Sequence, residues 1–381
     1  MASGRFAVYL DEEPLGPRAL ARLTELELRQ GDDAIGLLRM RFSLAQGADG
    51  TYPLLDAEGI EPGTAISLAL AAPGGSDQRV FTGYLAYLRP HFEAIEANAY
   101  LDVVAHDPAI LLEAEERVAS YPDASDADAA AEILARYGID LQAEATDAQA
   151  AEDDQLLIQR GTDWAFLRYL AERNGYTIYF EADPTDGRSK CVFGPPRLDD
   201  TPQADLTILR ENANLVWIDF QVAHDRPARR VGAAIDTLAK RLVRVDAQST
   251  APVMGETLFA EQAGQALARV ASVSPVRFLR GAVPRDTALN AHAAGQMAAD
   301  GQVVEARGEL DPGLYRNLLR PHTPVLIKGV GDRLSGTYYV RSVRTVMKEG
   351  ELSQTFAAVT NALGRTGAED FGQSAEEEPA A

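Results

Sequence analysis

The most informative stretch of the sequence is QLLIQRGTDWAFLRYLAERNGYTIYF, residues 155–180. It predicts a strand, a capped helix, a glycine stop and a second strand. Thr162 or Asp163 can accept a hydrogen bond from the N–H groups of the first helical turn. Gly175 stands where a helix C-terminus belongs. A single apolar stripe at helical spacing comprises Trp164, Leu167, Leu170 and Ala171.

The residues before this stretch divide into a strand-rich part and a helical part. Apolar runs of strand length, separated by turn sequences, predict an antiparallel barrel or sandwich. The runs are 6–10, 23–28, 38–44, 65–70, 80–88 and 99–104. From residue 107 the apolar spacing becomes helical, and a second helix is expected near Ser125, with Asp128 completing an imperfect capping box. Gly138 is expected to end that helix.

Beyond residue 200 a second strand-rich region is expected. Its predicted strands are 215–222, 241–245, 303–307, 325–328, 337–346 and 352–359. Between them we expect a helix at 257–270 and another near 288–299. Residues 365–381 are acidic and small, which predicts a disordered tail. The expected fold class is therefore mainly β with α insertions (α+β).

Composition narrows the range of partners. Lys and Arg number 36 against 57 Asp and Glu, a formal net charge of -21. This charge opposes close approach to phosphate backbones, so we expect no specific nucleic-acid binding. A single cysteine, Cys191, is expected to be a buried structural thiol. No leader pattern or long apolar run predicts membrane insertion, and cytoplasmic assembly is the expectation.

The segment 155–180 resembles the signature of the phage late control protein D family and of the matching part of type VI secretion spike proteins (VgrG). That signature has a glutamine-bearing strand, a Thr-Asp pair, an aromatic-rich helix, a glycine and an aromatic strand. The residues that match in order are Gln159, Thr162, Asp163, Trp164, Phe166, Leu167, Gly175, Tyr176 and Phe180.

Two further stretches support the resemblance, which spans roughly residues 5–364. Phe81 to Gly83 and the segment 107–130 are similar to the family's first barrel and its helical connection. The run 326–340 is similar to its C-terminal glycine turn and Gly-x-Tyr-Tyr-Val strand, but the expected Arg-Asn pair is only Thr360-Asn361 here. The matching residues of that run are Gly329, Gly331, Gly336, Tyr338 and Tyr339.

The resemblance implies a baseplate hub, like that of T-even phages. Its domains would be a first β-barrel tube domain (1–106), a helical and mixed domain (107–200) and a second β-barrel tube domain (201–364) with a helical insertion at about 255–300. A homotrimer would present six similar units to a sixfold inner tube protein. The expected partners also include baseplate wedge proteins and a spike, which is predicted to be a separate polypeptide because only the acidic tail follows residue 364. The protein would end up in a phage tail or injection particle.

The sequence contains no recognisable pattern of catalytic, cofactor-binding or metal-ligating residues, so the chain is not expected to be an enzyme. Gly329, Gly331 and Gly336 resemble a phosphate loop, but Leu334 stands at the third glycine position and a strand follows, which favours a hairpin. The five histidines are scattered, and acidic clusters are typical of helix starts and solvated faces.

Two other functions stay open. Some tail proteins are lytic, so a tail-associated cell-wall hydrolase is one alternative, although glycoside hydrolysis needs a pair of suitably spaced carboxylates. A free-standing carbohydrate-binding β protein is the other. The negative charge has two explanations: channel walls that repel cargo, or solubility alone.

Overall fold

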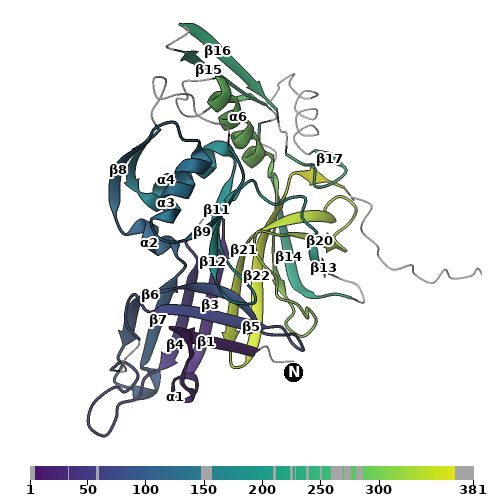
Figure 1. Ribbon diagram of the computed structural model, residues 1–381. Helices are drawn as coiled ribbons and strands as arrows, with labels where there is room; N and C mark the ends of the chain where they lie inside the picture. The colour runs from purple at the N-terminus through teal and green to yellow at the C-terminus, as the bar shows by residue number, and fades with distance from the viewer. Residues whose placement is uncertain are drawn as a thin grey trace, which may run out of the picture.

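A single large sheet forms the frame of the molecule in the computed structural model (Figure 1). The structure describes residues 5–32, 34–56, 60–146, 157–208, 212–223, 226–227, 229–236, 240–248, 251–258, 269, 276–279 and 286–364. Thirteen strands belong to this sheet, and eleven of them follow one path in the order β14-β19-β22-β21-β3-β4-β7-β6-β5-β1-β2.

The first strand-rich region supplies one half of the sheet. Its elements are β1 (Arg5–Leu10), β2 (Glu13–Pro14), α1 (Pro17–Leu20), β3 (Leu23–Gly31), β4 (Leu37–Ser43), β5 (Ala65–Ala71), β6 (Gln78–His91), η1 (Glu96–Asn98) and β7 (Tyr100–His106). Alternate residues of these strands are buried, as in β4, where Leu38, Met40 and Phe42 enter the apolar core.

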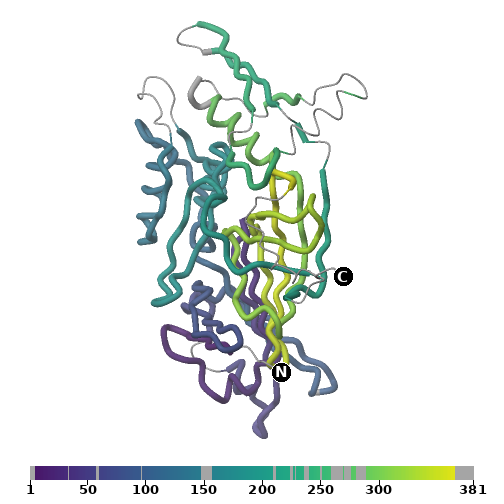
Figure 2. The backbone as a smooth tube through the Cα atoms, turned by 90° about the vertical axis from the view of Figure 1, so that its right-hand side faces the viewer, coloured from purple at the N-terminus to yellow at the C-terminus, as the bar shows by residue number. Residues whose placement is uncertain are grey.

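A compact lobe follows, drawn in blue and teal beside the sheet in Figures 1 and 2. It contains α2 (Ala109–Glu113), β8 (Glu116–Tyr121), α3 (Asp126–Ala135), β9 (Asp140–Ala143), β10 (Leu157–Thr162), α4 (Asp163–Asn174), β11 (Thr177–Ala182) and β12 (Ser189–Gly194). Strands β8 and β10 form one small sheet, and β9, β12 and β11 form another. The buried Cys191 lies in the core of this lobe, as expected.

The second strand-rich region completes the large sheet. Its elements are β13 (Gln203–Thr207), β14 (Leu215–Val222), β15 (Arg229–Asp236), β16 (Arg241–Ala247), β17 (Thr257–Leu258), β18 (Val276–Phe278), α6 (Asp286–Gly301), β19 (Val304–Leu310), β20 (Pro324–Lys328), β21 (Gly336–Lys348), β22 (Glu351–Thr360) and β23 (Ala362–Leu363). Strands β15, β16 and β18 form a separate small sheet that α6 covers on one face.

The expected fold class, mainly β with α insertions, is confirmed, but the expected closed barrels are not present in the described residues. No strand ladder there closes the sheet on itself. The two strand-rich regions are instead joined along one seam, where residues 342–348 of β21 pair antiparallel with 25–31 of β3. The boundaries proposed for the domains stay a prediction.

The predicted ends of α4, at Thr162 and Gly175, are confirmed, whereas α3 ends at Ala135, before the expected Gly138. The side chain of Thr162 caps α4, because its Oγ1 accepts a hydrogen bond from the Ala165 N–H (3.1 Å). The helix ends at Gly175, whose φ of 69° is left-handed. Ser125 and Asp128 form a full capping box at α3, not the imperfect one expected.

One helix prediction needs correction at its start. Thr257 and Leu258 form the short strand β17, paired with β23, so no helix begins at Thr257. Thr257 and Leu258 form a strand because they pair with the backbone of Leu363 and Ala362, which are distant in the sequence. Local apolar spacing carries no signal for such a pairing. Most of 259–270 and the predicted tail 365–381 lie outside the described residues. The second expected helix is confirmed as α6.

Gly175 provides a test of how the lobe contacts α6. A Cβ at Gly175 would overlap the backbone of Gly295 in α6, whereas a Cβ at Gly138 would meet nothing within 4 Å. Both glycines have positive φ, 69° and 65°. We expect Gly138→Ala to lower the free energy of unfolding by about 1 kcal/mol, from backbone strain alone. Gly175→Ala should cost about 1–3 kcal/mol more, because α6 must also move.

Urea denaturation of both variants measures this difference. Equal losses of stability would contradict the close contact between α4 and α6.

Candidate assembly surface

A buried hydrogen-bond network contains two polar residues of the 155–180 signature. Gln159 and Asp163 are both fully buried. Gln159 Nε2 donates to Asp163 Oδ1 (2.6 Å), and Tyr137 Oη donates to Asp163 Oδ2 (2.7 Å). Tyr121 Oη in turn donates to Gln159 Oε1 (2.6 Å), and Arg136 lies 3.3 Å from Asp163. Every one of these groups is satisfied by a neighbour, so the arrangement ties β8, β10, α3 and α4 together.

The apolar residues of the same signature build the core of the lobe. Trp164, Phe166 and Leu167 are buried on α4, and Phe180 of β11 packs 6.1 Å from Trp164, between ring centres. Tyr176 packs edge-on against Phe193 at 5.4 Å. With Thr162 and Gly175 at the helix ends, these signature positions are accounted for by capping and packing.

The C-terminal matching residues form a hairpin, as expected, and not a phosphate loop. Strands β20 and β21 pair antiparallel across it. Gly329 and Gly331 have φ values of 82° and 84°, which turn the chain, and Gly336 begins β21. Tyr338 and Tyr339 are each 1% exposed. Tyr338 Oη donates to the Leu334 carbonyl (2.8 Å), which closes the turn.

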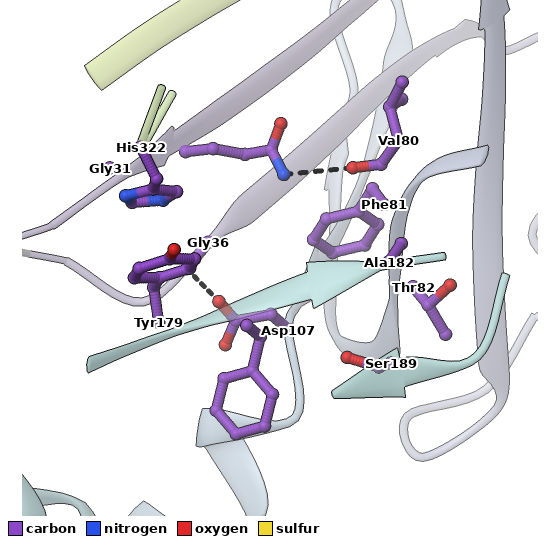
Figure 3. A pocket seen from close by; sticks show the side chains of 12 residues that line it. Gly31, Gly36, Val80, Phe81, Thr82, Asp107, Tyr179, Ala182, Ser189 and His322 are labelled. Atoms are coloured by element: carbon purple, nitrogen blue, oxygen red, sulfur yellow. Dashed lines mark hydrogen bonds between the residues drawn. The ribbon is translucent and has the colours of Figure 1, made fainter. Parts of the chain in front are cut away.

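A small cavity marks the joint between the three regions of the chain (Figure 3). His322 Nδ1 lies 2.6 Å from Asp32 Oδ1, and the His322 ring stacks on Tyr179 with 3.5 Å between centres. Burial raises the pKa of Asp107 to about 7, although the Gly36 and Ala109 N–H groups, at 2.6 and 3.0 Å, favour its charged form. The joint holds β3, the lobe and the loop before β20 together.

One face of the large sheet is lined by charged residues and is here called the charged face. Its residues alternate with those that enter the two apolar cores. Strand register places basic and acidic residues on it in equal number. The basic ones are Arg29, Arg39, Arg41, Arg89, Arg307, Arg344 and Lys348. The acidic ones are Glu25, Glu27, Asp102, Asp219, Glu305, Glu309 and Glu351.

Glu27 is the centre of this face. It is 2% exposed and contacts three arginines: Arg29 (2.7 Å), Arg39 (2.7 Å) and Arg344 (2.5 Å). Burial would raise the pKa of Glu27, but hydrogen bonds from Arg344, Arg29 and Arg39 outweigh it and lower the pKa to about 2. Asp102 holds Arg41 in a two-pronged pair at 2.7 and 2.8 Å.

Sequence reasoning missed the charged face, although a signal was present. Charged residues alternate with apolar ones in 23–29 and again in 37–42. This pattern predicts that each strand has a polar side. It does not predict that the polar sides of the two strand-rich regions join into one surface.

Replacing Glu27 should weaken the fold in a pH-dependent way. We expect Glu27→Gln to lower the free energy of unfolding at neutral pH by about 1–3 kcal/mol, because three arginines lose their shared carboxylate. The folded pKa lies below the ordinary value of 4.5, so this stabilisation is present above pH 4.5 and is lost as the pH falls toward about 2. Urea denaturation of the unchanged protein and of Glu27→Gln at several pH values measures the difference between their free energies of unfolding.

The control is Glu305→Gln, which removes a more exposed carboxylate paired with Arg307 on the same face. It should change stability by less than about 0.5 kcal/mol. If the loss of unfolding free energy caused by Glu27→Gln stayed constant from pH 7 to pH 3, the lowered pKa of Glu27 would be contradicted.

The described part of the chain contains neither a cluster of metal-ligating side chains nor a helix that could span a membrane. No three His, Cys, Asp or Glu side chains there are grouped so that they could hold a metal ion. Among the same residues, no helix has the length and apolar character required to cross a bilayer.

The comparison with protein families gives one match. The model of the Alg8 N-terminal domain covers residues 21–349, most of the chain. The chain belongs to the Alg8 N-terminal domain family. Its matched residues include the whole 155–180 segment, the seam between β3 and β21, and all residues of the charged face except Glu351. A search of curated proteins found no match.

Solved structures similar to this member of the Alg8 N-terminal domain family come from phage tails and secretion systems. A tail protein from Neisseria meningitidis MC58 has a TM-score of 0.65 at 12% identity and covers 95% of this chain and 98% of its own. A 43 kDa tail protein of prophage MuSo2 from Shewanella oneidensis has a TM-score of 0.62 at 15% identity, covering 95% and 100%.

An E. coli component of the type VI secretion system gives a TM-score of 0.53 at 11% identity, covering 89% of this chain and 73% of that one. That E. coli protein is structurally similar to the T4 bacteriophage tail proteins gp27 and gp5. The tail-hub-like fold suggested by the sequence is therefore confirmed. Membership of the late control protein D family stays a prediction.

Proposed function

We propose that this chain is a non-enzymatic baseplate hub of a phage tail or contractile injection machine. It would act as a homotrimer that joins a sixfold inner tube protein to a separate threefold spike, with baseplate wedge proteins around it. Assembly would take place in the cytoplasm before the particle is complete. The tail and secretion proteins that share its fold support this proposal.

One observation carries the proposal: the large sheet contains eight consecutive antiparallel strands that divide into two groups of four. The groups are β14-β19-β22-β21 and β3-β4-β7-β6, and the seam between β21 and β3 joins them. Each group has one apolar face and one charged face. Three copies would therefore present six four-stranded groups, which matches a sixfold partner without any change of sequence.

The ends of this strand series leave backbone groups for a neighbouring copy. In the described residues, β14 pairs with β19 alone, and the last part of β6, after Leu85, pairs with β7 alone. Val216 and Trp217 on β14 are 55% and 42% exposed. Free strand edges favour pairing with another chain. In a ring, β14 of one copy would lie beside β6 of the next.

The charged face would line the channel of such a ring. Its basic and acidic residues are equal in number, so the formal charge of -21 does not arise from it. A surface of neutralised ion pairs has little net attraction for cargo of either sign. The proposed channel wall would therefore carry equal numbers of acidic and basic residues, and not a net negative charge.

The test is the mass of the purified protein in solution by light scattering, alone and with a co-expressed spike. The proposal expects a trimer, or a monomer that becomes a complex of three copies with three spike chains. A monomer that binds no tail component would contradict it. Reproducible loss of turbidity of isolated peptidoglycan would instead support a cell-wall hydrolase.

A further inference from the structure

A second cavity lies between the lobe and the large sheet, next to the cavity of Figure 3, and shares part of its lining. Its volume is about 40 Å³. Leu28, Leu70 and Val80 line it from the sheet, Phe180 lines it from the lobe, and Leu318 lines it from the loop before β20. Apolar side chains from three parts of the chain therefore form much of its wall.

Arg320 places a positive charge in this wall. Its side chain is half-buried, and in the described residues no ion pair joins it to a carboxylate. Arg320 Nη2 donates to the neutral amide oxygen of Gln78 (2.6 Å). The Gln203 amide fixes the backbone of Arg320, because it accepts from the Arg320 N–H (2.9 Å) and donates to the Arg320 carbonyl (2.9 Å). The guanidinium is thus held at the cavity by neutral partners.

Arg320 differs in this respect from arginines that have acidic partners. Burial would lower the pKa of Arg39 and of Arg173, but hydrogen bonds and charge attraction from Glu27 and Asp126 outweigh it and raise both pKa values. For Arg320, burial lowers the pKa, and the attraction of a more distant acid does not offset the shift. The surroundings of Arg320 therefore disfavour its charge.

The distant acid is Glu181, which also lines the cavity. Its carboxylate is already paired with Arg197 (3.3 Å) and Lys190 (3.6 Å). Glu181 therefore does not supply the missing counter-charge. A charge that is withdrawn from water needs an opposite charge or further hydrogen bonds as compensation. An anion in the cavity would provide this compensation for Arg320.

We propose that this cavity binds a small carboxylate, whose two oxygens accept hydrogen bonds from the guanidinium of Arg320. A planar carboxylate matches the fork of N–H groups on an arginine. The apolar wall suits a short hydrocarbon group. A cavity of about 150 Å³ holds benzene, so about 40 Å³ admits a carboxylate with one or two carbons, such as acetate. The ligand would contact both the lobe and the loop before β20, and would stabilise the joint between them.

Ligand-observed NMR with sodium acetate tests the site, with sodium chloride added to keep the ionic strength constant. We expect saturable binding with a Kd on the order of 1 mM, because a ligand of four heavy atoms binds no more tightly than roughly 0.05 mM. Acetate should also raise the melting temperature of the protein. Sodium phosphate should not displace acetate, since a larger tetrahedral anion does not fit the cavity.

Four variants separate charge, shape and volume. Arg320→Gln should raise the Kd for acetate by about tenfold or more. Arg320→Lys keeps the charge but loses the fork, so its Kd should lie in between. Ala182→Val narrows the cavity from the lobe and should weaken binding with Arg320 in place. The matched control is Arg316→Gln, an exposed arginine of the same loop, which should leave the Kd unchanged.

The outcomes are independent of the proposed hub, because none of them depends on the number of copies in a complex. A rise in melting temperature with acetate in the unchanged protein and in Arg316→Gln, but not in Arg320→Gln, would support the site. Acetate that fails to bind, or that binds Arg320→Gln as well as the unchanged protein, would overturn it. Displacement of acetate by phosphate would overturn the assignment to a carboxylate.

Discussion

Asp163→Ala is expected to lower the free energy of unfolding by about 3–5 kcal/mol. The carboxylate is fully buried and accepts hydrogen bonds from Gln159 Nε2 and Tyr137 Oη. Its removal leaves the fully buried Gln159 amide and the partly buried Tyr137 hydroxyl each without one partner, and the more exposed Arg136 loses its ion pair. Buried groups left without partners cost more than an average hydrogen bond contributes.

Thermal and urea denaturation measure this loss, with Glu132→Ala as the control because Glu132 is an exposed acid on α3. The control should change stability by less than about 0.5 kcal/mol. Asp163→Asn keeps the shape and should recover part of the loss. A loss below about 1 kcal/mol for Asp163→Ala would mean that the network does not hold the lobe together.

Trp164→Ala is the other large effect, about 3–5 kcal/mol. Trp164 is 5% exposed, packs on Phe180 and belongs to the core that joins α4 to β11. The substitution would leave a cavity that α4, fixed at both ends by Thr162 and Gly175, is poorly able to fill. The hydrogen-exchange rates of backbone amides should therefore increase more in the lobe than in the large sheet.

Tyr169→Ala provides a matched control on the same helix, because Tyr169 is an aromatic residue that is 52% exposed. It should cost less than about 1 kcal/mol. Equal losses for the two aromatic residues would contradict the assignment of Trp164 to the core.

The parts of the fold that the sequence predicted are those with local causes. Thr162 begins α4 and Gly175 ends it because capping and left-handed φ involve residues within a few positions. The seam between β21 and β3 has no such signal, because residues 342–348 and 25–31 are far apart in the sequence and pair only in the folded chain. The strand β17 was missed for the same reason, and its residues were assigned to a helix.

The candidate surface shows the same limit. The signature residues Gln159 and Asp163 were identified from a family pattern, and their burial in one network explains why these residue types stand there. The charged face depends on pairs such as Glu27 with Arg344, which lie in different strand-rich regions. Periodicity indicates that each strand has a polar side, but only strand order shows that these sides form one surface.

Electron cryo-microscopy of the protein assembled with its spike tests the hub proposal most directly. We predict three copies around one axis, with the eight strands from β14 to β6 of each copy surrounding a channel and the charged face turned toward it. A complex with another number of copies, or with the charged face turned away from the axis, would contradict the proposal.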